Sequence, residues 1–305
     1  MATFLLRVSV ALLSAAGLLS GPAYAQDARG AMFADSDETA KQGPGAFRRP
    51  RIDRPLSDGI LVRGTRNIAA AWFSGPTERY RHFALGTEHE AETLVVSTTD
   101  RKVFRLQLPA DSVFEDREPR LADVDGDGLD EVIVVRSYLK TGAALAVVAV
   151  RTDGLEIMAE TPPLGAPFQW LNPAGVADFD GDGRPDIALV RMPHRIGELE
   201  LWTLKEGKLM RIITEDDVSN HAIRSHQFRL SAIADFDGDG LSDLAIPSFD
   251  RRSLRILSFR GGRVREIDRI ALPAVAAENF TVEMRDGRPA VGVGLNGGRT
   301  LVVTP

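Results

Sequence analysis

A nine-residue pattern, Asp-x-Asp-Gly-Asp-Gly-x-x-Asp/Glu, occurs three times and constrains the fold more than any other feature. The copies begin at Asp123, Asp178 and Asp235, so successive copies start 55 and 57 residues apart. A nearly constant period of this size indicates a repeat architecture such as a solenoid, propeller or array. Thirteen of the 43 acidic residues lie in these loops, so the acidity of a chain with net charge −6 is concentrated there.

Apolar segments flank each loop in the same order. A short apolar piece precedes the loop, and a longer apolar run follows it, as expected of strands buried on both faces. Two further strand-like segments then complete the repeat, which gives four strands, the number in a propeller blade. The strands predicted after the loops are 132–135, 144–150 and 155–160, then 187–190, 199–204 and 209–214, then 244–246, 254–259 and 264–270.

Weaker copies of the repeat lie on both sides of these three. Residues 94–96 and 103–108 repeat the strand pattern behind a degraded loop at 86–90, and residues 286–289 echo the loop near the C-terminus. The last copy stops one strand short, and the apolar segment 68–73 could supply that strand, since closure removes open sheet edges. The sequence therefore predicts an all-β fold: a β-propeller of five blades of four antiparallel strands, closed by an N-terminal strand, with four or six blades as alternatives.

The acidic loops require a cation. Carboxylates at positions 1, 3 and 5 repel one another, and an all-oxygen ligand set favours calcium over zinc or copper. An EF-hand loop is excluded because its closing acid stands at position 12, where this chain has Val134, Leu189 and Ile246. We predict about three structural Ca²⁺ ions, bound by side chains at positions 1, 3, 5 and 9 and by the backbone carbonyl at position 7. The predicted ligands are Asp123, Asp125, Asp127, Leu129, Glu131, Asp178, Asp180, Asp182, Arg184, Asp186, Asp235, Asp237, Asp239, Leu241 and Asp243.

The three loops and their strands resemble the FG-GAP/VCBS-type repeats of integrin α-subunit heads and many exported bacterial proteins. The resemblance covers roughly residues 60–305 and is specific for the three loops. It implies a calcium-stabilised β-propeller with the ions on one face. The Phe-Gly and Gly-Ala-Pro elements of the integrin type do not flank the loops, so the likeness is closer to the bacterial VCBS type. Adhesins, lectin-like modules and some lyases share this fold, so the resemblance leaves the function open.

The first 58 residues indicate export and a tether. Arg7 precedes an apolar run over residues 8–19, and residues 23–25 (Ala-Tyr-Ala) match a signal-peptidase site. We predict a signal peptide at 1–25, a disordered linker at 26–58, and a propeller at 59–305 in a secreted or periplasmic, bacterial protein. No later stretch is apolar enough for a membrane span. The chain has no cysteine, which excludes disulfides and thiolate catalysis. Export argues against a nucleic-acid partner for the basic run at 48–54.

Loops at the end opposite the acidic loops are predicted to collect bases and aromatic residues. We expect an exported, non-catalytic binding or adhesion module for a glycan or protein, with an anionic partner suited to the bases. The alternatives are that these loops are polar only because they are hydrated, or that the chain is a lyase-type enzyme acting on an acidic polysaccharide. No catalytic residue is assigned. A lyase would use Arg191 together with His194, His221 and His226. The ligand-face candidates are Arg136, Tyr138, Lys140, Trp170, Asn172, Arg191, His194, Arg195, His221, Arg224, His226, Arg251 and Arg252.

The charge distribution adds one expectation about these candidates. Bound calcium would neutralise the loop acids at one end, while Arg136, Arg191 and Arg251 would remain positive at the other. The two ends should therefore differ in charge, unless these three arginines lie apart or are paired with acids inside the fold.

Overall fold

The computed structural model describes residues 54–87 and 89–305 as an all-β protein. The predicted signal peptide and the linker as far as residue 53 lie outside the described residues. Residues 54–58, predicted as the end of the linker, belong to the fold: Leu56 is buried and its N–H donates to the carbonyl of Phe73 (3.0 Å). The domain therefore begins upstream of residue 59. Within the described residues, no helix has the length and apolar character needed to cross a membrane.

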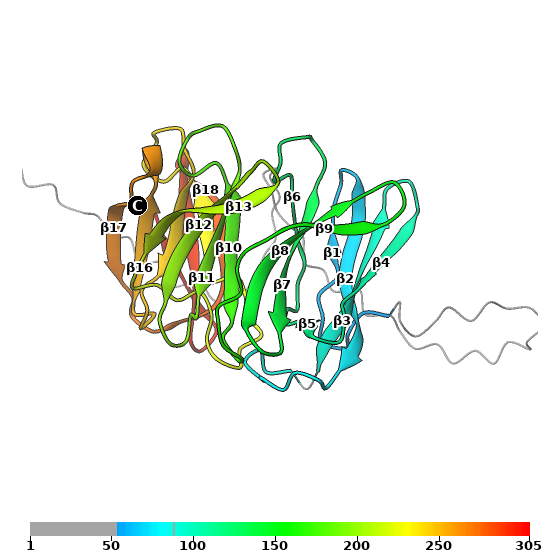
Figure 1. The fold of residues 1–305 in the computed structure, drawn as a ribbon. Coiled ribbons are helices and arrows are strands. Elements are labelled where there is room, and N and C mark those ends of the chain that lie inside the picture. The colour runs from blue at the N-terminus through cyan, green and yellow to red at the C-terminus, as the bar shows by residue number, and fades with distance from the viewer. Residues whose placement is uncertain (1–53, 88) are drawn as a thin grey trace, which may run out of the picture.

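Each of the three acidic loops joins a short inner strand to a buried second strand, as predicted. The second strands β7 (Glu131–Tyr138), β11 (Asp186–Arg191) and β15 (Asp243–Pro247) are buried along nearly their whole length because both of their faces pack against neighbouring sheets. The strands form five successive antiparallel groups, here called units I to V, and the acidic loops lie in units II, III and IV (Figure 1). Unit II consists of β5 (Ser112–Phe114), β6 (Arg120–Ala122), β7, β8 (Gly142–Val150) and β9 (Leu155–Glu160). Unit III consists of β10 (Leu171–Ala177), β11, β12 (Glu198–Lys205) and β13 (Lys208–Glu215), and unit IV of β14 (Ala232–Ala234), β15, β16 (Ser253–Ser258) and β17 (Arg265–Ala271).

The inner strand of unit II is interrupted. Strands β5 and β6 both pair with β7, and the residues between them leave the ladder. Asp116 supplies a side-chain hydrogen bond in place of a ladder bond: its carboxylate accepts the N–H of Val135 (3.0 Å) and also pairs with Arg120 (2.6 Å). A single bridge between Ala91 and Phe114 joins unit II to unit I, so the two form one nine-stranded sheet.

Unit I differs from the sequence-based assignment. It consists of β1 (Val62–Arg63), β2 (Ile68–Thr77), β3 (Glu90–Thr98) and β4 (Val103–Gln107). Its first turn is therefore residues 64–67. The predicted degraded loop at 86–90 is not the counterpart of an acidic loop, because it runs into β3 and its last residue, Glu90, is the first residue of that strand. The predicted closing role of residues 68–73 was wrong, because β2 pairs with β1 and β3. A two-residue inner strand carries no apolar pattern that could have revealed it.

Unit V contains β18 (Ala276–Arg285), β19 (Arg288–Leu295) and β20 (Arg299–Val303). A two-residue turn replaces the acidic loop, with Asp286 and Gly287 at φ 49° and 77°, the positive angles of a tight hairpin turn. Among the described residues, no strand pairs with the outer edge of β20.

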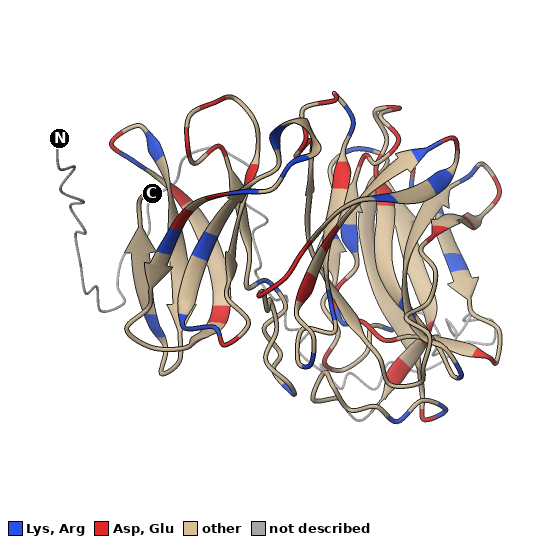
Figure 2. Cartoon of the chain, turned by 60° about the vertical axis from the view of Figure 1, so that its left-hand side comes forward, with Lys and Arg blue, Asp and Glu red and all other residues tan. Residues whose placement is uncertain are grey.

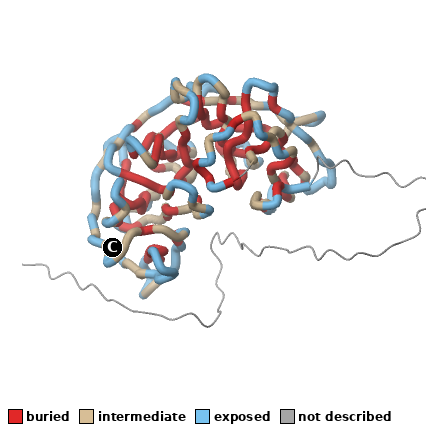
Figure 3. Tube along the Cα trace, turned by 90° about the horizontal axis from the view of Figure 1, so that it is seen from below, coloured by how far each residue is buried: buried red, intermediate tan, exposed pale blue. Residues whose placement is uncertain are grey.

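The five units form an arc instead of a closed ring (Figure 3). Hydrophobic clusters pack adjacent units against each other. Loops bridge the arc where strands do not: the N–H of Arg224, in the crossover between units III and IV, donates to the carbonyl of Ala84 in unit I (2.8 Å). Near the axis, Arg229 forms an ion pair with the buried carboxylate of Glu118 from unit II. Units distant in sequence are thus held together without a shared sheet.

Gly142, the first residue of β8, provides a test of this packing. Its φ is 79°, and a Cβ atom there would lie 2.3 Å from the carbonyl oxygen of Ala166. Gly142→Ala should therefore lower the free energy of unfolding by about 2 kcal/mol or more, measured by urea denaturation. Gly207→Ala is the matched control, because Gly207 also has a positive φ (72°) but a Cβ there meets no atom within 4 Å. Equal stability of the two variants would contradict the packing described.

Candidate functional site

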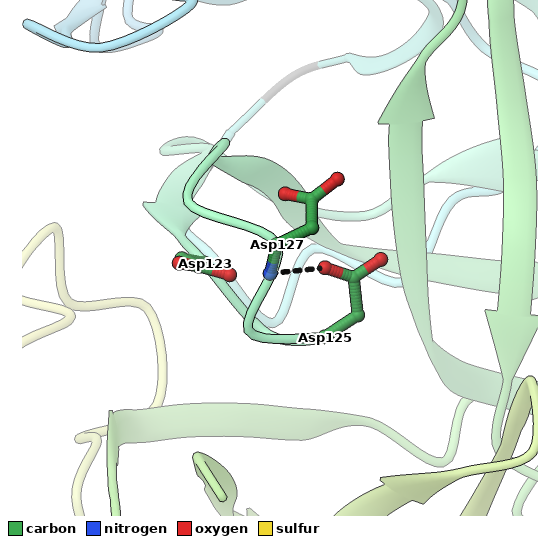
Figure 4. Close-up of side chains that lie close together, drawn as sticks. All are labelled: Asp123, Asp125 and Asp127. Carbon is green, nitrogen blue, oxygen red and sulfur yellow. Dashed lines mark hydrogen bonds between the residues drawn. The ribbon is translucent and has the colours of Figure 1, made fainter.

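The three acidic loops have one backbone conformation. In the first, both oxygens of Asp123 accept backbone N–H groups, from Gly126 (2.8 Å) and Gly128 (3.0 Å), and Asp125 accepts the N–H of Asp127 (3.1 Å) (Figure 4). The corresponding bonds recur in the second and third loops. The glycines at positions 4 and 6 have positive φ in all three, which lets the backbone wrap around the carboxylates.

This conformation brings carboxylates together. In each loop, three of them offer oxygens that lie within 4.8 Å of one another. Such a group could hold a divalent cation, and an all-carboxylate set suits a hard ion. The groups are Asp123, Asp125 and Asp127; Asp178, Asp180 and Asp186; and Asp235, Asp237 and Asp239.

The acid at position 9 supplies an independent indication. One oxygen of Asp186 accepts the N–H of Phe179 (3.2 Å), and the other is buried without a protein partner. Asp243 repeats this arrangement, with one oxygen bonded to the N–H of Phe236 (2.9 Å) and the other unpartnered. Buried carboxylate oxygens are rarely left without partners, so both atoms fit the role of cation ligands.

Burial and the neighbouring carboxylates also raise the pKa of the position-9 acids. The pKa of Glu131 rises to about 7, that of Asp186 to about 7, and that of Asp243 to about 6. Each value reflects the cost of a buried negative charge beside others. Without a cation, the negative charge of each loop is therefore only partly balanced by its surroundings.

The first two loops also contact an adjacent unit. The carbonyl of Asp180 accepts the N–H of Gly261 (2.8 Å), in the short 3-10 turn η2 (Arg260–Gly262) of unit IV. In the first loop, Asp130 bonds to Asn67 of unit I through both its N–H (2.7 Å) and its carbonyl (3.1 Å).

The position-7 residues, whose carbonyls are predicted ligands, donate their N–H groups to the position-5 carboxylates in all three loops; these residues are Leu129, Arg184 and Leu241.

The ligand-face candidates lie in turns and crossovers at the end opposite the acidic loops, or at the strand ends beside them. Two of them serve the fold. Asn172 is fully buried and donates to the carbonyls of Asn220 and Phe228. Trp170 is buried in a hydrophobic cluster and donates to the carbonyl of Glu115 (3.0 Å). The exposed candidates are Lys140, Arg195, Arg224, His226 and Arg252.

The three arginines expected to make this end positive share it but differ in their partners. Arg136 lies over the ring of Tyr138 (4.3 Å) and pairs with Glu160 (3.6 Å), and Arg191 pairs with Glu198 (3.2 Å). Arg251 forms no ion pair within the described residues. The expected contrast in charge is accordingly reduced, and both signs of charge are visible at both ends in Figure 2.

Two of the candidate histidines form a pair. His194 Nε2 lies 2.8 Å from His221 Nδ1, and His221 Nε2 lies 3.0 Å from the carbonyl of Ser225. Both ring nitrogens of the buried His221 are therefore engaged, and Arg191 is neutralised by Glu198. Two of the four residues that the lyase alternative requires are thus occupied by contacts within the protein.

Sequence reasoning missed a buried polar cluster between units I and II. His82 Nδ1 lies 2.5 Å from the fully buried carboxylate of Glu115, which also accepts the hydroxyl of Ser137. Burial, together with Glu115, raises the pKa of the nearby Glu90 to about 8. The sequence signal for this cluster is the charged run at 115–118, which lies between β5 and β6.

Comparison with known proteins supports the repeat assignment. Residues 123–189 match the FG-GAP-like repeat family. This segment is similar to an FG-GAP-like repeat. It contains the first two acidic loops and the strands between them, so the predicted resemblance is confirmed there. No curated protein matches the chain.

Solved structures similar to this chain include three rhamnogalacturonan lyases. The exotype lyase YesX is 13% identical with a TM-score of 0.42, over 82% of this chain and 57% of that one. The Bacillus licheniformis lyase PL11 is 17% identical (TM-score 0.41; 67% and 42%), and the lyase YesW is 17% identical (TM-score 0.38; 77% and 48%). This chain therefore spans between 42% and 57% of their lengths, and likeness at this level carries no inference about activity.

The raised pKa of Glu90 predicts a pH effect. A carboxyl group whose pKa is higher in the folded state stabilises the fold while it is protonated, and that contribution is lost as the pH rises through about 8. In saturating calcium, wild-type stability should fall by about 1–2 kcal/mol between about pH 6.5 and 8.5, and Glu90→Gln should remove most of that fall. Exposed Glu206→Gln is the control. Parallel pH profiles for Glu90→Gln and wild type would show that Glu90 is already ionised.

Proposed function

We propose that the chain is an exported, non-catalytic β-propeller of five blades that is stabilised by calcium and binds a ligand at the end opposite its acidic loops. The five units of the arc are the proposed blades. Export rests on the pattern of residues 1–25, and calcium rests on the converging carboxylates and the unpartnered oxygens of Asp186 and Asp243.

The proposed calcium ligands are the residues at positions 1, 3, 5, 7 and 9 of each loop. When bound, calcium would supply positive charge that offsets the repulsion among these side chains. One arginine pairs with a predicted ligand in the first loop (Arg66 with Asp123) and one in the second (Arg184 with Asp182). The third loop has two such arginines, since Arg260 pairs with Asp239 and Arg265 with Asp237. We therefore expect the third site to be the weakest of the three.

Calcium should stabilise the fold measurably. Sites that form only in the folded state contribute about 1–3 kcal/mol each when free calcium exceeds the dissociation constant by about 10- to 100-fold. Removing a ligand at position 3, by Asp180→Ala, should abolish one site and reduce the rise in Tm that calcium produces. Asp153→Ala, at an exposed turn, should keep the full rise. An unchanged rise in the Asp180 variant would contradict the ligand assignment.

The observation that carries the binding proposal is the distribution of exposed apolar side chains. Half of the ten large hydrophobic residues that are exposed in the described parts of the chain lie in loops at the opposite end. Apolar residues gathered on one surface indicate an interaction site. These five are Phe83, Phe168, Ile196, Ile223 and Phe249.

Unpaired bases and constrained backbone accompany them. Lys140, Arg195 and Arg252 are exposed and form no ion pair within the part of the chain that the structure describes. Phe83 and Phe168 have φ of 57° and 59°, a conformation that bulky residues adopt only when their surroundings impose it and that is concentrated at functional sites. A surface that combines apolar, aromatic and basic groups suits a glycan or a protein partner with anionic groups.

The binding proposal can be tested with a surface variant. Wild-type protein in calcium should be retained on at least one of immobilised alginate, polygalacturonate, hyaluronan, dextran or polyglutamate, and Phe168→Ser with Ile223→Ser should weaken that binding about tenfold or more. Met210→Ser, at an equally exposed apolar residue on the outer strand β13, is the control. Retention on no probe, or equal loss in both variants, would contradict the assignment of this end.

A further inference from the structure

Arg251 is an exception to the way this protein treats its buried arginines. The side chain of Arg255 is 4% exposed and pairs with Glu215 and Glu266 (both 2.6 Å), and that of Arg117 is 3% exposed and pairs with Asp58 (2.5 Å). Arg251 is half-buried, and its pKa is lowered by that burial. Its Nε is buried without a partner, and no acidic side chain in the described residues pairs with it.

The one polar contact of this guanidinium is with the backbone. Nη1 of Arg251 donates to the carbonyl of His221 (3.1 Å), which leaves its remaining N–H groups without protein acceptors. A partly desolvated cation without a counter-ion is energetically unfavourable, and a bound anion would offset that cost. The guanidinium plane is suited to a carboxylate, which can accept two of its N–H groups at once.

The backbone around Arg251 holds it in place. Arg251 lies in the turn between β15 and β16 with φ 57°. Its N–H donates to the carbonyl of Ser248 (2.8 Å), and its carbonyl accepts the N–H of Ala276 (2.9 Å) from unit V. These bonds fix the backbone of Arg251, and the bond from Nη1 to the carbonyl of His221 orients its side chain before any ligand arrives, which lowers the entropic cost of binding.

Neutral imidazoles lie beside the guanidinium. The pKa of His194 is lowered to about 4 by burial and by the charge of Arg251, and that of His221 is lowered to about 3 by burial and by His194. Because the carbonyl of Ser225 can only accept, His221 carries its proton on Nε2, and its Nδ1 accepts from His194 Nε2. Nδ1 of His194 is then a hydrogen-bond acceptor with no partner in the described residues.

We propose that Arg251 anchors a subsite for an acidic sugar, in which the guanidinium binds the sugar carboxylate and Nδ1 of His194 accepts a ring hydroxyl. This inference rests on the proposed binding function and specifies its ligand class. An acidic peptide is disfavoured, because an Asp or Glu side chain offers only the carboxylate, whereas a uronic acid carries carboxylate and hydroxyl groups on one rigid ring. Arg136 and Arg191, which have acidic partners of their own, do not contribute to this subsite.

The test uses the calcium-loaded full chain, with a galacturonic acid tetramer, its methyl ester and a polyglutamate peptide as probes. Calorimetry should show that Arg251→Gln weakens binding of the tetramer about tenfold or more, since a charge-assisted pair is lost. Arg251→Lys should retain part of the affinity, and the methyl ester should bind wild type no better than the tetramer binds Arg251→Gln. Arg191→Gln, at a paired arginine of the same end, should change the affinity less than about twofold.

The outcomes separate this inference from the function on which it rests. Tetramer binding that Arg251→Gln leaves intact, or that the methyl ester reproduces, would overturn the Arg251 subsite alone. Polyglutamate binding that depends equally on Arg251 would assign the site to an acidic protein instead. Binding of none of these probes would overturn the subsite, and failure on the wider panel as well would overturn the binding function. Melting temperatures of all variants, measured in parallel, show whether a lost affinity reflects lost folding.

Discussion

Repulsion among carboxylates at the tips of three inner hairpins is the constraint on which the rest of the structure depends. Backbone N–H groups from each loop satisfy part of the charge, and the same bonds fix the turn that sends the chain into a buried strand. They do not satisfy all of it, since buried oxygens of Asp186 and Asp243 have no protein partner. The proposed calcium would supply what is missing, and its binding would then be coupled to the turn that starts each second strand.

The hydrogen bonds of the acidic loops extend beyond a single unit. The carbonyl of Asp180 is bonded to η2 of the next unit, and Asp130 is bonded to Asn67 of the preceding one. At the opposite end, the crossover that contains Arg224 is bonded to the loop of unit I at Ala84. No shared sheet closes the arc. Loop contacts therefore hold neighbouring units together, both at the end with the acidic loops and at the opposite end. The end that lacks acidic loops carries exposed apolar and basic side chains.

The repeat made much of the fold predictable. Strand positions in units II to IV follow from the Asp spacing and the apolar runs, and β9 occupies the predicted residues 155–160. The two-residue strand β1 has no periodic signal, and missing it misplaced residues 68–73 as a closing strand. Partners of individual arginines could not be predicted either. The pairing of Arg191 with Glu198 depends on the register of β11 and β12, and the isolation of Arg251 depends on a crossover from another unit.

The most direct test of the central claim is the number of calcium ions bound per chain, measured by mass spectrometry of the metal content after equilibrium dialysis against millimolar calcium. The account predicts three ions, with the third loop the first to lose its ion as calcium is lowered. A folded protein that retains one ion or none under these conditions would contradict it, because the carboxylates of at least two loops would then be accommodated without a cation.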